Sequence, residues 1–221
     1  MKAILFDFNG TIFFDSDINR YAWNQTINEL TNNTINFDEV YKEYHSVRNN
    51  IFVEAMLKKL GKEAKQEEID YWSNRKETQY YQKYCIENNR NQLAPGLEKF
   101  LDYLKNNYIP INLCTASLQT NVDFYFNYLK IGRWFDKNII TYDTGEYQNK
   151  VEMYKRCAKN INYDIKDCIV IEDSASSIKQ AIDAGCQNLI AIKKEDTPDY
   201  QEIKIVINDF NELDYDKVLK I

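Results

Sequence analysis

The sequence predicts an α/β protein: a Rossmann-like core of parallel strands with helices on both faces, and an inserted all-helical cap domain. Short apolar runs of strand length alternate with helical patterns over most of the 221 residues. A long stretch after the first run has helical patterns and no strand-like run. We therefore expect an α/β core of residues 1–15 and 89–221 and a helical cap of residues 16–88.

The predicted strands are short runs, several of them rich in isoleucine or valine. They are Ala3–Phe6, Ile109–Cys114, Ile139–Tyr142, Cys168–Ile171, Leu189–Ile192 and Ile203–Ile207. Helical spacing separates them, for example at Leu97, Phe100, Leu101 and Leu104. Strands that alternate with helices in this way predict a mostly parallel sheet covered on both faces.

The sequence of the predicted cap indicates consecutive amphipathic helices. We expect them at residues 17–31, 37–48, 50–60 and 66–88. Trp23 and Trp72 are the expected core anchors of this block. Pro95-Gly96 is a loop marker after which the sheet is expected to resume.

Composition excludes several classes of partner. A net charge of -6 argues against a nucleic-acid partner, which favours a basic face. The apolar runs are too short and too interrupted by charge for a membrane span. Met1-Lys2 leads directly into a strand, so no signal peptide is expected. The five cysteines are odd in number and lack C-x-x-C spacing, which indicates reduced thiols in a cytoplasmic protein.

The histidine and glycine contents narrow the chemistry. His45 is the only histidine, so a histidine-rich metal site is excluded. A Ser-His-Asp triad would have to use His45, which lies in a polar stretch with helical character and has no nucleophile elbow nearby. No two of the six glycines can form G-x-G-x-x-G or a P-loop. Any chemistry is therefore expected to depend on carboxylates, lysines and hydroxyls.

Polar residues stand where three of the predicted strands end. These are Asp7, the segment Thr115-Ala116-Ser117, and the segment Glu172-Asp173-Ser174; Lys150 precedes the helix that leads to the third strand. Ligands of open parallel sheets bind at the carboxyl ends of the strands. Each residue alone would usually be a turn, cap or surface residue. The order and spacing of all these residues together indicate an active site much more specifically than any one residue does.

This order resembles the motifs of the haloacid dehalogenase superfamily, whose members are mostly magnesium-dependent phosphatases. Asp7-Phe8-Asn9-Gly10-Thr11 matches the first motif, Asp-x-Asp-Gly-Thr, except at Asn9. Thr115 matches the second motif, Lys150 the third, and Glu172-Asp173-Ser174 the fourth. The likeness extends over essentially the whole chain and indicates the helical-cap subgroup, which includes β-phosphoglucomutase and many sugar-phosphate phosphatases.

The resemblance implies a role for each matched residue. Asp7 would be the nucleophile and a Mg²⁺ ligand, with the backbone carbonyl of Asn9 and the Asp173 carboxylate as further ligands. Glu172 would hold a metal-bound water. Lys150 would add positive charge near the phosphoryl group. Thr115, and with it Ser117 and the backbone after Thr115 at Ala116, would hold phosphate oxygens. These oxygen donors suit Mg²⁺.

Two cap positions are implied as substrate-binding residues. Asn19 falls where the mutase has a cap-hinge histidine, and Arg48 where it has a cap arginine that binds a distal phosphate. A bidentate contact with phosphate would suit Arg48, although an exposed arginine at a helix end is an equal alternative. Leu118 stands where a phosphate-binding lysine would serve a bisphosphate intermediate. Asn9, Asn19 and Leu118 together argue against efficient mutase activity.

Asn9 replaces the carboxylate that usually serves as general acid and base in this family. Loss of such a group costs about 10²–10⁴-fold in rate. Three alternatives follow: a phosphohydrolase that is slow or limited to good leaving groups; a different reaction of the superfamily, such as dehalogenation, mutase chemistry or phosphonate cleavage; or a phosphometabolite-binding protein without turnover. Phosphonate cleavage would need a cap lysine that forms an imine, for which the candidates are Lys58, Lys59, Lys65 and Lys76. An engineered substitution at Asn9 is a further alternative.

We therefore predict a Mg²⁺-dependent phosphohydrolase that acts on a small phosphorylated metabolite through an aspartyl-phosphate on Asp7. The expected protein is a monomer or weak dimer with neither a nucleic-acid nor a membrane partner.

Overall fold

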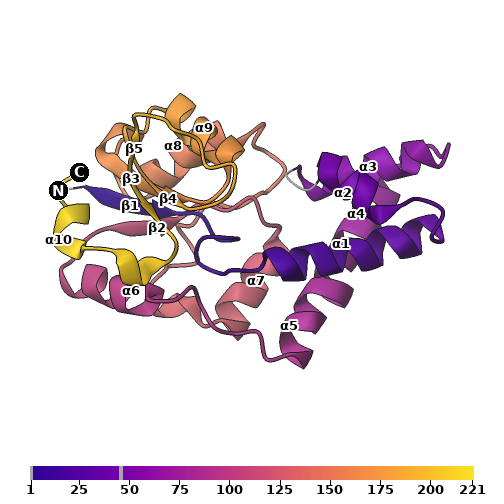
Figure 1. Ribbon diagram of the computed structural model, residues 1–221, viewed down its shortest axis with the longest axis horizontal. Coiled ribbons are helices and arrows are strands. Elements are labelled where there is room, and N and C mark those ends of the chain that lie inside the picture. Colours follow the sequence, from indigo (N-terminus) through magenta and orange to yellow (C-terminus); the bar gives the residue numbers. More distant parts are fainter. Residues whose placement is uncertain (1, 45–46) are drawn as a thin grey trace. The chain divides into compact units, whose positions relative to one another are not determined.

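The computed structural model describes residues 2–44 and 47–221. It divides the chain into two compact units, Met1–Phe14 with Gln92–Ile221 and Asp15–Asn91 (Figure 1). His45 lies outside the described residues. The last two residues of the helix predicted at 37–48, Val47 and Arg48, are described and are not helical, so its predicted end is wrong.

A five-stranded parallel sheet forms the centre of the first unit, which confirms the predicted α/β class. Its strands, in spatial order, are β2 (Ile111–Leu113), β1 (Ala3–Phe6), β3 (Cys168–Glu172), β4 (Asn188–Ile192) and β5 (Ile203–Ile207). The first four are largely buried, as expected of parallel strands covered by helices.

The predicted strand at Ile139–Tyr142 is wrong. Within the described residues this segment joins the sheet only through an isolated bridge between Cys114 and Thr141. The Ile139 carbonyl accepts hydrogen bonds from the side-chain amides of Asn112 and Asn160. β2 itself is shorter than predicted and ends at Leu113.

Helices and short helical turns surround the sheet (Figure 1). They are α6 (Leu97–Asn106), α7 (Gln119–Tyr128), α8 (Lys150–Asn160), α9 (Ala175–Ala184) and α10 (Tyr215–Val218), with 3₁₀ turns η2 (Ile131–Arg133), η3 (Ile165–Asp167) and η4 (Phe210–Glu212). Successive residues of β1 point to opposite faces. Leu5 belongs to the core cluster that α8 and α9 cover, whereas Phe6 contacts Phe100 of α6 and Phe210 of η4.

The second unit is helical throughout its described secondary structure. Its elements are α1 (Ser16–Thr31), α2 (Phe37–Tyr44), α3 (Asn49–Lys59), α4 (Gln66–Arg75), the π-helix η1 (Lys76–Gln82) and α5 (Lys83–Glu87). Trp23 packs against Phe52, with ring centroids 4.4 Å apart, and Trp72 borders the same core. The predicted helix at 66–88 corresponds to three consecutive helical segments, with a π-helix that the sequence pattern did not predict.

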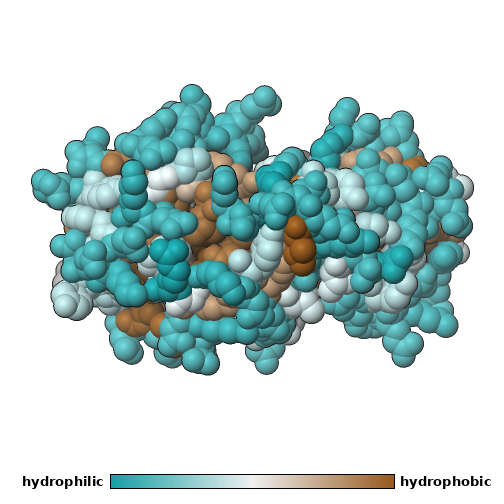
Figure 2. Space-filling model, turned by 90° about the horizontal axis from the view of Figure 1, so that it is seen from below, coloured by the Kyte–Doolittle hydropathy of each residue, from teal (hydrophilic) through white to brown (hydrophobic). Residues whose placement is uncertain are grey.

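Figure 2 shows a face of mostly hydrophilic side chains, with apolar groups in patches between them. Among the described helices, none combines the length and the apolar character needed to cross a bilayer.

Candidate active site

The polar residues predicted at the strand ends lie together at the topological switch point of the sheet, where the order of the strands reverses. β1 pairs with β2 on one side and with β3 on the other, and β4 and β5 continue beyond β3. In parallel sheets of this order the crevice beside the first strand is the usual ligand site. Asp7 follows β1 directly, and Glu172 is the last residue of β3. Parallel pairing therefore brings together residues that are far apart in the sequence.

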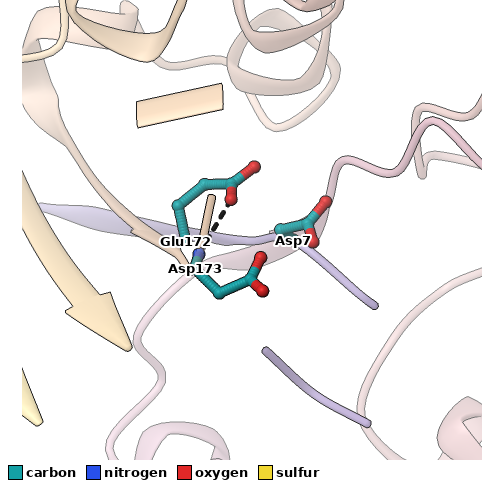
Figure 3. A group of neighbouring side chains, drawn as sticks. All are labelled: Asp7, Glu172 and Asp173. Atoms are coloured by element: carbon teal, nitrogen blue, oxygen red, sulfur yellow. Dashed lines mark hydrogen bonds between the residues drawn. The ribbon is translucent and has the colours of Figure 1, made fainter. Parts of the chain in front are cut away.

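Three carboxylates form a compact cluster at this point (Figure 3). One oxygen from each of Asp7, Glu172 and Asp173 lies within 4.8 Å of the others. Asp7 and Glu172 are buried, and Asp173 is half-buried. Such closely grouped carboxylates repel one another and need positive charge to compensate them.

Gly10 allows the turn after β1 to approach Asp173 closely. Its φ of +76° is in the region that favours glycine, and a Cβ atom at this position would lie 2.0 Å from Asp173 Oδ2. Any side chain here would displace the Asp173 carboxylate. The glycine of the first motif therefore keeps the main chain at Asn9 and Gly10 close to the carboxylate cluster.

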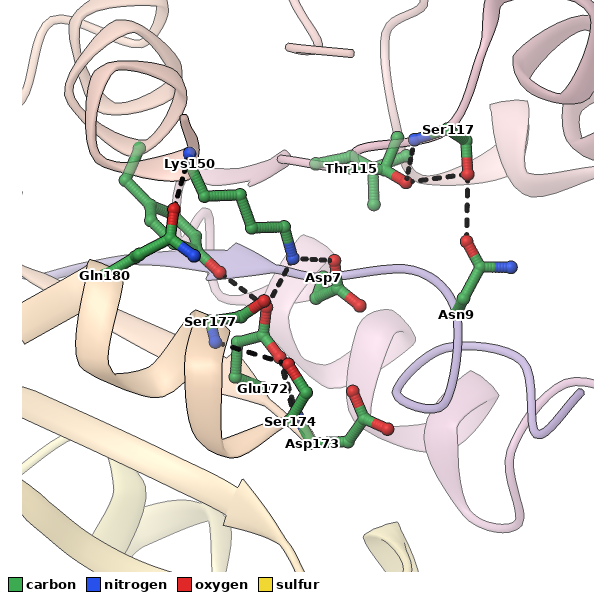
Figure 4. A network of polar contacts seen from close by, with 12 residues as sticks. Asp7, Asn9, Thr115, Ser117, Lys150, Glu172, Asp173, Ser174, Ser177 and Gln180 are labelled. Atoms are coloured by element: carbon green, nitrogen blue, oxygen red, sulfur yellow. Dashed lines mark hydrogen bonds and ion pairs between the residues drawn. The ribbon is translucent and has the colours of Figure 1, made fainter. Parts of the chain in front are cut away.

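Lys150 supplies a buried positive charge. Its Nζ lies 2.6 Å from Asp7 Oδ1 and 2.5 Å from Glu172 Oε1, and its side chain is only 10% exposed. Lys150 is the first residue of α8, where its backbone N–H donates to Gln180 Oε1 at 2.8 Å. The position at the start of the helix directs the side chain toward both carboxylates (Figure 4).

Protein donors occupy both oxygens of the Glu172 carboxylate. Oε1 accepts from Lys150 and from the Tyr154 hydroxyl at 2.6 Å, and Oε2 accepts the backbone N–H groups of Asp173 and Ser174. A carboxylate offers about four acceptor sites, so this environment strongly orients Glu172. In this structure, Glu172 holds Lys150 and the turn after β3 in place.

The electrostatic environment affects the carboxyl groups differently. Burial, followed by the negative charge of Glu172, raises the pKa of Asp7 well above its usual value despite the nearby Lys150. Burial also acts to raise the pKa of Glu172, but the charge and hydrogen bond of Lys150, with the hydrogen bonds of Tyr154 and Ser174, outweigh it and lower that pKa. Burial disfavours charged Lys150, but Asp7 and Glu172 together raise its pKa above the usual value.

The hydroxyl groups after β2 form the other side of the site (Figure 4). The Thr115 hydroxyl donates to Ser117 Oγ at 3.0 Å, and Ser117 Oγ donates to Asn9 Oδ1 at 2.8 Å. Asn9 Nδ2 donates to the Tyr125 hydroxyl at 3.1 Å. The Asn9 side chain is thus turned toward the segment after β2, and it takes part in a hydrogen-bond network with Ser117 and Tyr125.

The remaining predicted substrate-binding residues have different surroundings. Ala116 is exposed between Thr115 and Ser117. Asn19 belongs to the helical unit, where its amide donates to Asp15 Oδ2 at 3.1 Å and its oxygen accepts from Lys76 at 2.7 Å. Arg48 directly precedes α3 in the same unit and is half-buried. Their roles in substrate binding stay predictions.

Three residues at the site were not singled out by the sequence. Lys194 Nζ lies 3.6 Å from Asp173 Oδ2, and Tyr154 and Tyr125 make the contacts described above. Lys194 could have been predicted, because it follows β4 and ligands bind at the carboxyl ends of parallel strands. Tyr154 could have been predicted from helical spacing, which places it on the same face as Lys150. No local pattern marks Tyr125.

The donor set fits a magnesium ion. Mg²⁺ prefers oxygen ligands and is commonly bound by one or two carboxylates. The carboxylate of Asp173 is half-buried beside the nucleophile candidate Asp7, and the main chain of Asn9 lies in the adjoining turn. Lys150 and Lys194 contact the three clustered carboxylates, which when all ionised carry one more negative charge than these two lysines neutralise.

Comparison with known proteins agrees with this geometry. The family model for haloacid dehalogenase-like hydrolases matches residues 1–185, and the chain belongs to this family. A curated relative, "Putative phosphatase YhcW" of Bacillus subtilis (strain 168), is 25% identical over 197 residues, which cover 88% of this chain and 84% of that protein.

Solved structures share the fold over nearly the whole length. A family IA, variant 3 hydrolase of the same superfamily from Entamoeba histolytica HM-1:IMSS has a TM-score of 0.86 and 26% identity, covering 100% of this chain and 98% of that one. β-Phosphoglucomutase from Clostridium difficile has a TM-score of 0.78 and 22% identity, covering 100% and 96%. CbbY from Rhodobacter sphaeroides, a mutant in complex with xylulose-(1,5)bisphosphate, has a TM-score of 0.77 and 18% identity, covering 97% and 96%.

Proposed function

We propose that the protein is a Mg²⁺-dependent phosphohydrolase of small phosphorylated metabolites that uses Asp7 as its nucleophile. The observation that carries this proposal is the Lys150–Asp7 contact of 2.6 Å beside Asp173 at the switch point of the sheet. The family assignment and the phosphatase named among the relatives support the class of reaction. The sugar bisphosphate bound by CbbY supports the class of substrate.

In the first proposed step, an oxygen of Asp7 attacks phosphorus, and the bond from phosphorus to the leaving oxygen breaks with its electron pair on that oxygen. Water then attacks phosphorus, the bond from phosphorus to the Asp7 oxygen breaks and restores the carboxylate, and inorganic phosphate leaves as H₂PO₄⁻, which carries both protons of that water. Thr115 and Ser117 would hold phosphate oxygens, and Lys150 would offset the negative charge there. Bound Mg²⁺, held by Asp7, Asp173 and the Asn9 carbonyl, would neutralise charge on the phosphate.

Asn9 determines which substrates suit this site. An amide cannot deliver a proton to a leaving alkoxide, so substrates whose leaving group needs little protonation are favoured. Acyl phosphates and phosphoanhydrides meet this condition, whereas sugar phosphates do not. We therefore propose faster turnover of acyl phosphates than of hexose phosphates.

The test is phosphate release by the purified protein from acetyl phosphate, p-nitrophenyl phosphate and hexose phosphates, each with Mg²⁺ and with EDTA. We expect Mg²⁺-dependent multiple turnover, highest for acetyl phosphate. Asp7→Ala should remove it, while Asp167→Ala, which changes an exposed acid at the opposite end of β3, should retain it. Activity that survives Asp7→Ala would overturn the proposal. Saturable binding of these compounds without phosphate release would instead identify a phosphometabolite-binding protein.

A further inference from the structure

Tyr125 forms a ring of hydrogen bonds with Ser117 and Asn9, the residue that departs from the family motif. Its hydroxyl accepts from Asn9 Nδ2 at 3.1 Å and lies 3.0 Å from Ser117 Oγ. Ser117 Oγ in turn donates to Asn9 Oδ1 at 2.8 Å. Each of the three side chains therefore contacts the other two.

The position of the Tyr125 hydroxyl is fixed by packing. Tyr125 lies on α7, is fully buried, and stacks its ring on Phe8 with centroids 3.6 Å apart and an interplanar angle of 11°. Phe8 stands between Asp7 and Asn9 and is also buried. The aromatic stack thus ties α7 to the loop that carries the nucleophile candidate.

The oxygen and the nitrogen of the Asn9 amide need different hydrogen-bond partners. The oxygen accepts and the nitrogen donates, while each hydroxyl can do both. The Tyr125 hydroxyl accepts from the amide nitrogen at 3.1 Å and lies 3.4 Å from the amide oxygen, and Ser117 donates to that oxygen at 2.8 Å. Thr115, which donates to Ser117 Oγ, extends the same ordered chain.

We propose that Tyr125 is a positioning residue of this site, which orients the Asn9 amide and, through it, the Ser117 hydroxyl. The inference rests on the proposed function, because Ser117 matters for catalysis only if it contacts the phosphoryl group. Without the Tyr125 hydroxyl, Asn9 Nδ2 loses this acceptor, so the amide and the Ser117 hydroxyl that donates to it are held less firmly. Small displacements of positioning groups reduce the rate of the chemical step more than they weaken substrate binding.

The test compares Tyr125→Phe with Tyr128→Phe. The first variant removes the hydroxyl and keeps the ring that stacks on Phe8. The second removes a hydroxyl from the same helix but outside the ring of contacts, and it keeps the stacking of residue 128 on Phe124. With acetyl phosphate and Mg²⁺, we expect kcat of Tyr125→Phe to fall about tenfold and KM to change less than about twofold. Tyr128→Phe should match the wild type in both constants.

A second measurement does not depend on turnover. The side-chain amide signals of Asn9 in a ¹H–¹⁵N spectrum can be identified by their loss in Asn9→Asp. We expect them to shift and to exchange faster with water in Tyr125→Phe, and to stay unchanged in Tyr128→Phe.

The outcomes separate the two proposals. Shifted Asn9 signals together with a lower kcat support the positioning role. Unchanged Asn9 signals overturn it, as does a shifted signal with an unchanged kcat. If the wild type releases no phosphate from any tested compound, the proposed function is overturned, and the Asn9 signals still decide whether Tyr125 orients the amide.

Discussion

Lys150 and Asp7 form a buried ion pair, with Nζ 2.6 Å from Oδ1, and the same Nζ also contacts Glu172. One cation therefore links the residue that follows β1 to the last residue of β3. It partly neutralises a carboxylate cluster whose self-repulsion would otherwise oppose folding and the approach of a phosphate.

Replacing Lys150 should damage both stability and activity. Lys150→Met leaves Asp7 and Glu172 buried without their cation, and such a loss typically lowers the free energy of unfolding by about 3–5 kcal/mol. Phosphate release should fall by at least about 100-fold. Urea unfolding and acetyl phosphate turnover measure the two effects. Lys155→Met, an exposed change on α8, is the control, and an equal effect of both variants would contradict the assigned role.

Asp7→Asn should stabilise the metal-free protein at neutral pH. Burial and the charge of Glu172 raise the pKa of Asp7 in the folded state, so this group favours folding most when it is protonated. Its contribution is greatest below the ordinary carboxyl pKa of about 4 and is lost as pH rises through the higher folded pKa. The advantage of Asp7→Asn should therefore appear above about pH 4 and shrink below it.

Melting temperatures of wild type and Asp7→Asn, measured in EDTA between pH 4 and pH 8, test this sign. Asp167→Asn, which changes an exposed acid, should give no pH-dependent difference. An advantage of Asp7→Asn that did not vary with pH would show that ionisation of Asp7 is not its cause.

Magnesium should stabilise the wild type. A ligand that binds only the folded state adds about 2.7 kcal/mol at 100 times its Kd, which corresponds to several degrees in melting temperature. We expect EDTA to reverse the shift and Asp173→Asn to remove most of it. Asp167→Asn, at the other end of β3, should keep the full shift; loss of the shift in both variants would contradict a site at Asp173.

Restoring the family carboxylate at position 9 should speed the turnover of substrates with poor leaving groups. In Asn9→Asp the hydroxyls of Ser117 and Tyr125 can both donate to the new carboxylate, so the existing contacts accommodate it. The gain should be largest for hexose phosphates, about 10²-fold or more, and small for acetyl phosphate. Steady-state kinetics on both substrates measures it, and an equal or lower rate would mean that Asn9 serves another role.

The cysteines should be inert in the native protein. All five are free and buried. Burial raises the pKa of Cys85 and of Cys168 to about 12 and that of Cys186 to about 11, so little thiolate forms at neutral pH. We expect no rapid reaction with a disulfide reagent until denaturant is added, when five thiols should react. Fast labelling of the native protein would place a thiol at the surface.

Most of the sheet could be predicted because its signal is local. The runs at Ala3–Phe6 and Ile203–Ile207 have the same bounds in the structure, and each is a continuous apolar or isoleucine-rich stretch. Ile139–Tyr142 is likewise a short run rich in β-branched residues but forms only one bridge. A strand forms only where a second strand pairs with it, and the composition of a segment does not show whether such a partner is present.

The alternation of strands and helices can be read from the sequence alone. It also predicts that Asp7, Thr115 and Glu172 lie at one edge of the sheet, because parallel strands present their carboxyl ends together. The contacts of Tyr125 with Asn9 and of Tyr154 with Glu172 are visible only in the folded structure. The first result follows from periodicity within a few residues. The second depends on how helices pack against the sheet, which brings together side chains from distant segments that no local pattern relates.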